Sequence, residues 1–294
     1  MIKYYLHLTK PGIVLGNLMS SAGGFLIASR GAISYSLFIT MIVGTALVIA
    51  SGCVLNNIID RDIDGVMERT KHRVLVQHGQ IFLNQSIFYA VILSIFGFLF
   101  LSFTKNVLTI YLSAIGLFIY VGVYSLWMKR RSIYSIMVGS ISGAMPPVIG
   151  YCAAANQFDA GALMLLIIFS LWQIPHSHSI AILRLNDYKV AFIPTFPIKK
   201  GVESTKNHMV VYIIGFIIAT ILFTVMGYTS YIFLTIISIM NLWWLHMGFY
   251  GYRIINHDSL WAKKMFLLSL IIIVSLNLLL SLDHILFSTK NILL

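Results

Sequence analysis

A short stretch of the chain, from Asn56 to Asp64, combines amide and carboxylate side chains at a spacing that suits a metal ion. Asn56, Asp60 and Asp64 recur every four residues, so a helix would place all three on one face. Mg²⁺ prefers such oxygen ligands and is held by a few carboxylates together with substrate phosphates. Asn57, beside Asn56, is a further candidate ligand. The pattern predicts a site for Mg²⁺ and substrate phosphates; the alternative is a solvated helix end whose acids pair with neighbouring cations.

Basic groups accompany these acids. Only nine carboxylates occur in the 294 residues, and four of them lie between Asp60 and Glu68. The dense basic group that follows, Arg69 to Arg73, could hold anionic oxygens. A second segment, Leu183 to Pro197, has a similar composition, with one carboxylate, a phenol and flanking cations. A third basic group, Lys129 to Arg131, is open to two interpretations: phosphate binding or a signal of membrane topology.

The composition places these groups in a membrane protein. Of the 294 residues, 59% are hydrophobic and 10% are charged, whereas soluble domains carry about 25% charged residues. Apolar runs of about 20 residues, the length that crosses the hydrocarbon of a bilayer, recur along the chain. They predict one all-α polytopic membrane domain over residues 1–294 with about nine transmembrane helices. The expected spans are roughly 11–29, 36–56, 85–103, 107–126, 135–155, 161–182, 208–228, 230–250 and 265–285.

The basic residues predict the orientation. With a cytoplasmic N-terminus, all but three of the twenty Lys and Arg residues fall on the cytoplasmic side, the exceptions being Arg30, Lys105 and Lys290. The C-terminus is then expected on the periplasmic side. Two long loops, about 57–84 and 183–207, become cytoplasmic, and long ordered loops are usually functional. This distribution also accounts for the net charge of +11 without a nucleic-acid partner.

A few polar side chains lie within the predicted spans, where such groups tend to be functional. Gln173, His176 and His178 lie near the cytoplasmic part of the sixth span. For His176 the sequence leaves open a contact to a substrate, a role in proton transfer and a structural hydrogen bond. Cys53 and Cys152 lie in apolar segments, so we expect small buried hydrophobic residues rather than a disulfide.

Several of these motifs occur together, in one order, in a known family. Asn56-Asn57-x-x-Asp60-x-x-x-Asp64, followed by Glu68-Arg69-Thr70-Lys71-x-Arg73, resembles the first signature of the UbiA-type intramembrane prenyltransferases. The similarity is closer to the branch that makes haem O, and it runs from about residue 3 to about residue 285. The motifs that resemble this branch are Leu8-Thr9-Lys10-Pro11-Gly12, Tyr120-x-x-x-Tyr124-Ser125-Leu126-x-x-Lys129-Arg130, Gly143-Ala144-x-Pro146-Pro147-x-x-Gly150, Trp172-Gln173-x-Pro175-His176, and Asp187-Tyr188 with Ile193-Pro194.

The resemblance implies transmembrane helices around a central cavity, capped on the cytoplasmic side by the two Asp-bearing loops. It implies Mg²⁺-dependent transfer of the farnesyl group of farnesyl diphosphate to a vinyl group of haem b, with addition of water, to give haem O. The implied catalytic residues are Asp60, Asp64 and Asp187, which would also bind metal with Asn56 and Asn57. The implied diphosphate contacts are Arg69, Lys71, Arg73, Lys129, Arg184 and Lys189. The implied haem or cavity residues are Gln173, His176, Tyr120, Tyr124 and Tyr188.

Two other functions fit part of the pattern. An aromatic acid or quinone precursor could replace haem as the prenyl acceptor, but the single Asp of the second motif favours haem. A secondary transporter would place ionisable groups near the membrane midplane, whereas these acids lie at the predicted surface. We expect farnesyl diphosphate and haem b as substrates, membrane lipid around the protein, and handover of the product to a terminal oxidase. A bacterial inner membrane is the expected location, because no transit peptide is visible.

Overall fold

The computed structural model describes residues 2–254 and 257–288. Within this part of the chain, nine helical segments are long and apolar enough to cross a membrane, which confirms the predicted fold class. These segments are α2 (Pro11–Ser29), α3 (Tyr35–Ile59), α6 (Gly79–Ser102), α7 (Val107–Phe118) with its continuations η1 (Ile119–Met128) and α8 (Lys129–Arg131), α9 (Ser135–Ala155), α10 (Ala160–Leu183), α13 (Val202–Val225), α14 (Tyr231–Tyr250) and α15 (Asp258–Ser288).

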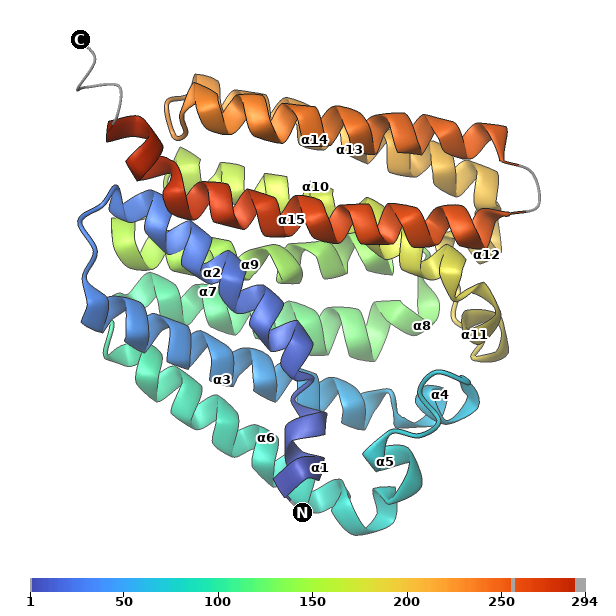
Figure 1. Ribbon diagram of the computed structural model, residues 1–294. Helices are drawn as coiled ribbons and strands as arrows, with labels where there is room; N and C mark the ends of the chain where they lie inside the picture. The colour runs from blue at the N-terminus through green and yellow to red at the C-terminus, as the bar shows by residue number, and fades with distance from the viewer. Residues whose placement is uncertain (1, 255–256, 289–294) are drawn as a thin grey trace.

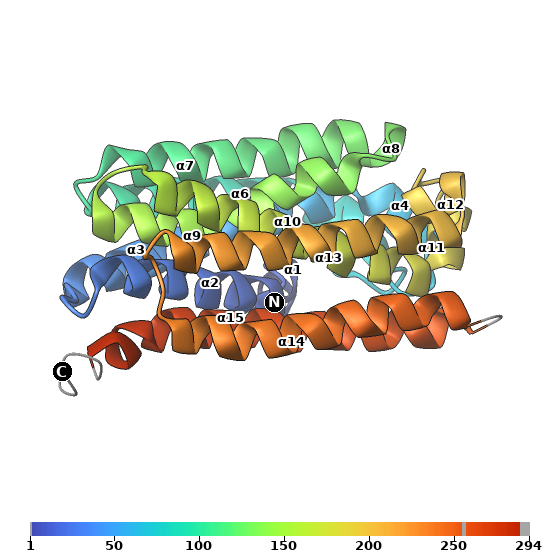
Figure 2. The same cartoon turned by 90° about the horizontal axis from the view of Figure 1, so that it is seen from above.

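The long helices lie side by side (Figure 1). Contacts between successive spans, and between the last span and the first, close them into a ring. In this ring α3 packs against α6, α2 against α9, and α10 against α9, α13 and α15. The last span, α15, returns to contact the first, α2. Figure 2 shows α14 and α15 along one side of the bundle and α6 and α7 along the other. The interior of the ring is therefore lined by residues from both halves of the sequence.

Small residues allow the closest of these approaches. A Cβ atom at Gly24 of α2 would collide with the carbonyl oxygen of Pro147, and one at Gly150 of α9 would collide with the carbonyl oxygen of Ser21. The two backbones thus touch where one of the two helices has a glycine, as in other membrane bundles. The helix α9 continues through Pro146 and Pro147, both buried.

The outer surface of the bundle is apolar as well as its interior. Phe88, Phe118 and Val225, on three different spans, are each about two-thirds exposed. Water would disfavour so extended an apolar surface, whereas lipid hydrocarbon covers it without cost. The chain is therefore an integral membrane protein.

Short helices close one end of the ring, where α15 begins (Figure 1). They are α1 (Ile2–Leu8), α4 (Arg61–Val66), α5 (Val74–Gln77), α11 (Leu185–Val190), α12 (Phe196–Lys200) and the 3-10 turn η2 (Gly251–Arg253). The long segments expected between spans, 57–84 and 183–207, contain several of these short helices. Helices of four to six residues are too short to produce a hydrophobic period in the sequence.

Three long helices also begin earlier than predicted, one of them α6, which starts at Gly79. α13 starts at Val202 and α15 at Asp258, several residues before the apolar runs that predicted them. Lys206 of α13 is buried and forms an ion pair with Asp258 (2.6 Å) and a hydrogen bond to Gly251 O (2.9 Å). These contacts satisfy the lysine charge, so the helix continues through residues that hydropathy excluded from the span.

Candidate active site

A cavity of about 760 Å³ lies among the helices and reaches the end that the short helices close. Its volume is in the upper part of the range of small-molecule sites. Away from the short helices the lining is largely apolar and includes Val48, Ile149 and Ile273. The charged and amide groups of the polar end are Lys10, Asn56, Asp60, Asp64, Arg69, Arg73, Lys129 and Arg184. The cavity therefore offers charges at one end and an apolar space in its depth.

Asn56, Asp60 and Asp64 share one face, as their spacing predicts. Although α3 ends at Ile59, hydrogen bonds from Asp60 N to Asn56 O (2.9 Å) and from Asp64 N to Asp60 O (2.8 Å) continue the helical turn into α4. All three side chains line the cavity, and none is more than 5% exposed. Buried carboxylates require cationic or hydrogen-bonding partners.

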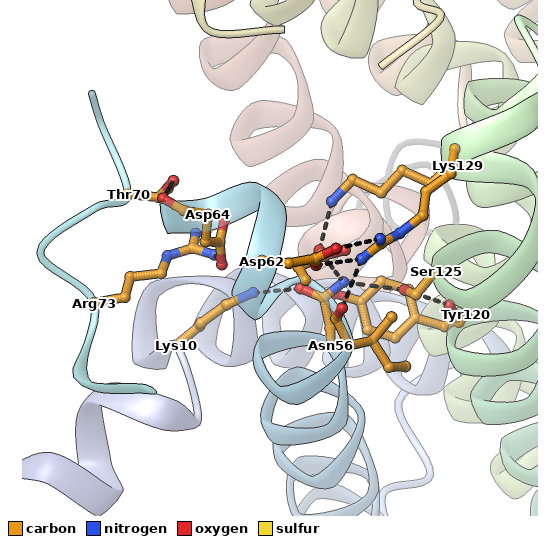
Figure 3. Close-up of polar contacts among 12 residues, drawn as sticks. Lys10, Asn56, Asp62, Asp64, Thr70, Arg73, Tyr120, Ser125 and Lys129 are labelled. Carbon is orange, nitrogen blue, oxygen red and sulfur yellow. Dashed lines mark hydrogen bonds and ion pairs between the residues drawn. The ribbon is translucent and has the colours of Figure 1, made fainter. Parts of the chain in front are cut away.

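Each acid has a cationic partner from another segment (Figure 3). Lys129, at the start of α8, forms an ion pair with Asp60 Oδ2, and Arg73, just before α5, forms one with Asp64 Oδ2. Both cations are less buried than the acids they contact, with side chains 15% and 28% exposed. Acidic and basic groups are thus already collected where a charged ligand would enter.

Asn56 connects the acids to two further residues. Its Nδ2 donates to Asp60 Oδ2 (2.8 Å) and to Ser125 Oγ (3.0 Å), and its Oδ1 accepts a hydrogen bond from Lys10 Nζ (2.6 Å) (Figure 3). Burial, followed by the charge of Arg73, lowers the pKa of Lys10 to about 8. Lys10 lies between α1 and α2, with a positive φ of 52°, and lines the cavity.

Lys10 and Ser125 are not among the site residues predicted from the sequence. A lysine beside a first span reads as an ordinary topology signal, and a serine within a span as a packing residue. The only sequence signal that points to them is their place in the motifs shared with the family. Their role depends on contacts with Asn56, which is 46 positions from Lys10 and 69 from Ser125.

A π-helical stretch positions the cavity face of the fourth span. Over η1 the turn is wider than in an α-helix: Lys129 N bonds to Tyr124 O, and Ser125 Oγ donates to Tyr120 O (2.8 Å). The rings of Tyr120 and Tyr124 stack at 6.0 Å between centroids, and both line the cavity together with Lys129. Such insertions are frequent at functional sites. The apolar run that predicted this span contains no signal for the wider turn.

The acid pair fits a magnesium ion. Asp60 Oδ1 is buried and has no hydrogen-bond partner in the described residues, so one carboxylate oxygen of the pair is available to a ligand. Asp64 and the amide oxygen of Asn56 lie on the same face. No group of three or more His, Cys, Asp or Glu side chains converges in the described part of the chain. Mg²⁺ needs only one or two carboxylates when phosphates and water complete its shell.

Some predicted site residues do not reach this cavity. Asn57 points instead toward α1, where its Nδ2 donates to Leu8 O (2.8 Å), and it does not line the cavity. Asp187 accepts a hydrogen bond from Glu68 N (3.2 Å) and so links α11 to the segment after α4. The predicted metal role of these two residues therefore finds no support in the geometry. Adjacent residues on a helix point about 100° apart, which separates Asn57 from Asn56.

Two of the predicted diphosphate contacts also lie outside the cavity. Lys71 forms an ion pair with Glu68 (2.7 Å), and the exposed Lys189 does not line the cavity. Arg69 and Arg184 do line it, at its polar end. Both arginines are exposed, so they can move toward a ligand.

The predicted haem or cavity residues all line the cavity. Gln173 and His176 project from α10, and Tyr188 from α11. Burial raises the pKa of Tyr188, so its phenol remains a neutral hydrogen-bond donor. Gly143 of α9 leaves the space that Gln173 fills, since a Cβ at that position would collide with the Gln173 amide.

Comparison with known proteins agrees with this arrangement. Residues 17–270 match the UbiA prenyltransferase family, so the chain belongs to that family. The sequence is 99% identical to protoheme IX farnesyltransferase of Blochmanniella pennsylvanica (strain BPEN), over 100% of both chains. It is 58% identical to protoheme IX farnesyltransferase of Blochmanniella floridana, over 97% of this chain and 98% of the relative. The family resemblance seen in the motifs is confirmed.

Solved structures share the fold at low sequence identity. A structure of digeranylgeranylglyceryl phosphate synthase superposes with a TM-score of 0.80 at 19% identity, covering 97% of this chain and 98% of the other. A UbiA homologue from Archaeoglobus fulgidus, bound to GPP and Mg²⁺, has a TM-score of 0.67 at 16% identity, covering 95% of this chain and 99% of the other. The ring of helices is therefore common to proteins with very different sequences.

Proposed function

We propose that this protein transfers the farnesyl group of farnesyl diphosphate to a vinyl group of haem b, with addition of water, and so makes haem O. One observation carries the proposal: a buried acid pair, matched by less buried cations, opens onto an apolar cavity of about 760 Å³. The near-identity to a protoheme IX farnesyltransferase supports haem as the acceptor.

We infer that Asp60, Asp64 and Asn56 hold Mg²⁺ together with the diphosphate. When bound, the metal supplies positive charge that stabilises the departing diphosphate. The homologue solved with GPP and Mg²⁺ supports a metal-dependent site of this kind. Arg73 and Lys129 pair with the two acids, and we infer that they turn toward the diphosphate oxygens when the diphosphate enters.

The bond between the farnesyl C1 carbon and the diphosphate oxygen breaks, and both electrons leave with the diphosphate. The allylic cation that remains must be kept from water. The apolar depth of the cavity limits the access of bulk water to the farnesyl cation, and the stacked faces of Tyr120 and Tyr124 offer π-electron density to it.

The terminal carbon of the haem vinyl group then attacks the farnesyl C1 carbon. A new carbon–carbon bond forms, and the positive charge moves to the vinyl carbon next to the porphyrin ring. Water adds to this carbon and loses a proton, which leaves the hydroxyl group of haem O. Gln173 and Tyr188 are hydrogen-bonding side chains of the cavity that can orient the acceptor or this water.

We also propose a location. The asymmetry of basic residues supports a cytoplasmic N-terminus and a cytoplasmic active site, in a bacterial inner membrane. Haem O remains membrane-soluble because of its farnesyl chain, which favours direct handover to a terminal oxidase in the same membrane.

The test is an assay of membranes that contain the protein. They are incubated with haem b, farnesyl diphosphate and Mg²⁺, with and without a chelator, and the haem products are resolved by mass. Chelator-sensitive formation of farnesylated, hydroxylated haem is the expected result. If a parallel panel of acceptors gives a prenylated aromatic acid and no haem product forms, the acceptor is an aromatic acid and not haem. If folded protein transfers the prenyl group to no acceptor, the proposed enzymatic function is refuted and a transporter is favoured.

A further inference from the structure

His176 is held in one orientation by its neighbours on α10 and α15. Its ring stacks on Trp172 at 4.7 Å between centroids and lies 5.1 Å from Phe266. The buried Ser269 fixes both rings: its carbonyl oxygen accepts from Trp172 Nε1 (2.9 Å), and its Oγ lies 2.8 Å from His176 Nδ1. The imidazole cannot rotate without breaking these contacts.

The same contacts assign the ring proton. Ser269 Oγ donates its single proton to Phe266 O (2.6 Å), so it can only accept from His176. With the Ser269 hydroxyl directed to Phe266 O, Nδ1 carries the proton and Nε2 keeps the free lone pair of the neutral imidazole. Nε2 has no hydrogen-bond partner among the described residues and is not enclosed by protein atoms, and His176 lines the cavity.

A histidine prepared in this way matches a metal ligand. Histidines that bind metals donate one ring N–H to a second residue, which fixes the tautomer and aims the other nitrogen at the metal. The neighbouring His178 is different: its Nε2 contacts His208 Nδ1 (3.0 Å) and it does not line the cavity. No other histidine in residues 2–254 and 257–288 lines the cavity.

We propose that His176 Nε2 binds the iron of the haem acceptor as an axial ligand and thereby positions the vinyl group. The inference rests on the proposed function, because the acceptor is the reactant that contains a transition metal. His176 lies eight residues before Arg184 on the cavity wall, roughly 12 Å along the axis of α10 from the polar end. Iron bound there would leave the porphyrin beside the apolar part of the cavity lining.

Iron ligation has spectroscopic consequences that packing alone does not produce. Purified full-length protein is loaded with haem b, reduced, and examined by resonance Raman spectroscopy for an iron–histidine stretching band. We expect this band in the wild type, its loss in His176→Gly, and its return when imidazole is added to that variant. The matched control His178→Gln, on the same helix, should retain it.

Binding of metal-free protoporphyrin IX separates ligation from shape. Relative to the wild type, His176→Gly should raise the Kd for haem b by at least about tenfold, the effect of 1.4 kcal/mol. The Kd for metal-free protoporphyrin should be unchanged. Retained binding of farnesyl diphosphate would show that the variant is folded. An equal loss of affinity for both porphyrins would assign His176 a packing role and refute iron ligation.

The outcomes distinguish this inference from the proposed function. If the wild type farnesylates haem b but shows no iron–histidine band, or if the band persists in His176→Gly, ligation is refuted and the function stands. If His176→Gly loses turnover with an unchanged haem spectrum, the residue acts as a base and not as a ligand. If folded wild-type protein neither binds nor farnesylates haem b, the proposed acceptor itself is wrong.

Discussion

The ammonium group of Lys129 contacts the carboxylate of Asp60, although the two residues are 69 positions apart. The π-helical stretch before Lys129 directs it into the cavity, and the turn between α3 and α4 directs Asp60 to meet it. Without ligand, this pair keeps a buried charge neutralised. With a metal and a diphosphate, both partners acquire new charges to contact, so the site can bind an anion without a large rearrangement.

The first prediction concerns the acid pair. Asp60→Asn should lower kcat/KM for farnesyl transfer by about 10²–10³-fold, because it weakens binding of the Mg²⁺ whose positive charge stabilises the leaving diphosphate. The product assay with haem b measures this. Asp62→Asn is the matched control, since Asp62 pairs with Arg130 (2.6 Å) and does not line the cavity. Equal losses in the two variants would contradict the assignment.

The guanidinium of Arg130 holds the pKa of Asp62 below its usual value, so this carboxylate is ionised and paired at neutral pH. The pair is largely exposed, with side chains 33% and 65% accessible. Exposed pairs contribute little to stability. The control variant should therefore fold normally, and its melting temperature in detergent checks this.

The second prediction separates two adjacent asparagines. Asn56→Ala removes the amide that joins Lys10, Asp60 and Ser125, so the Mg²⁺ concentration for half-maximal rate should rise by about tenfold or more. Asn57→Ala should leave this concentration unchanged. Its loss of the hydrogen bond to Leu8 O should cost about 1 kcal/mol of stability. A metal requirement that changes only in Asn57→Ala would reverse the assignment.

The third prediction is a pH dependence due to Lys10. Its pKa of about 8 leaves it charged at pH 7 and neutral at pH 9. If it contacts the diphosphate, the KM for farnesyl diphosphate should rise across this interval, by about tenfold for one charge-assisted hydrogen bond. Lys10→Gln should have the raised KM already at pH 7.

The control for Lys10 is Lys71→Gln, because Lys71 is paired with Glu68 outside the cavity. That variant should show the wild-type KM and the wild-type pH profile. The charged groups around Lys10 are Arg73, Asp60 and Lys129. If the KM of Lys10→Gln still rises between pH 7 and pH 9 as in the wild type, one of these groups titrates and not Lys10.

The fourth prediction tests the packing of α2 on α9. Gly150→Ala places a methyl group against the carbonyl oxygen of Ser21 and should destabilise the protein by about 3 kcal/mol or more. The apparent melting temperature in detergent is the measurement. Gly16→Ala is the control, because no atom lies within 4 Å of a Cβ at that position. Similar melting temperatures for the two variants would show that the helices can separate locally.

The sequence by itself determined the membrane class, the number of spans and the segment that we propose binds metal. Apolar runs of about 20 residues have few structural solutions in lipid, because every backbone polar group must be satisfied within a helix. The spacing of Asn56, Asp60 and Asp64 is local, so helix geometry alone places them on one face. Family motifs added Arg73, Lys129 and His176 to the cavity.

The tertiary structure decided which polar residues meet. It brings Lys10 and Ser125 to Asn56, turns Asn57 toward α1, and links Asp187 to the segment after α4. The short helices, the π-helical turn and the proton position on His176 follow from contacts between segments distant in sequence. A pattern read along one chain contains periodicity and composition, but these contacts depend on how helices pack, which many sequences can satisfy in different ways.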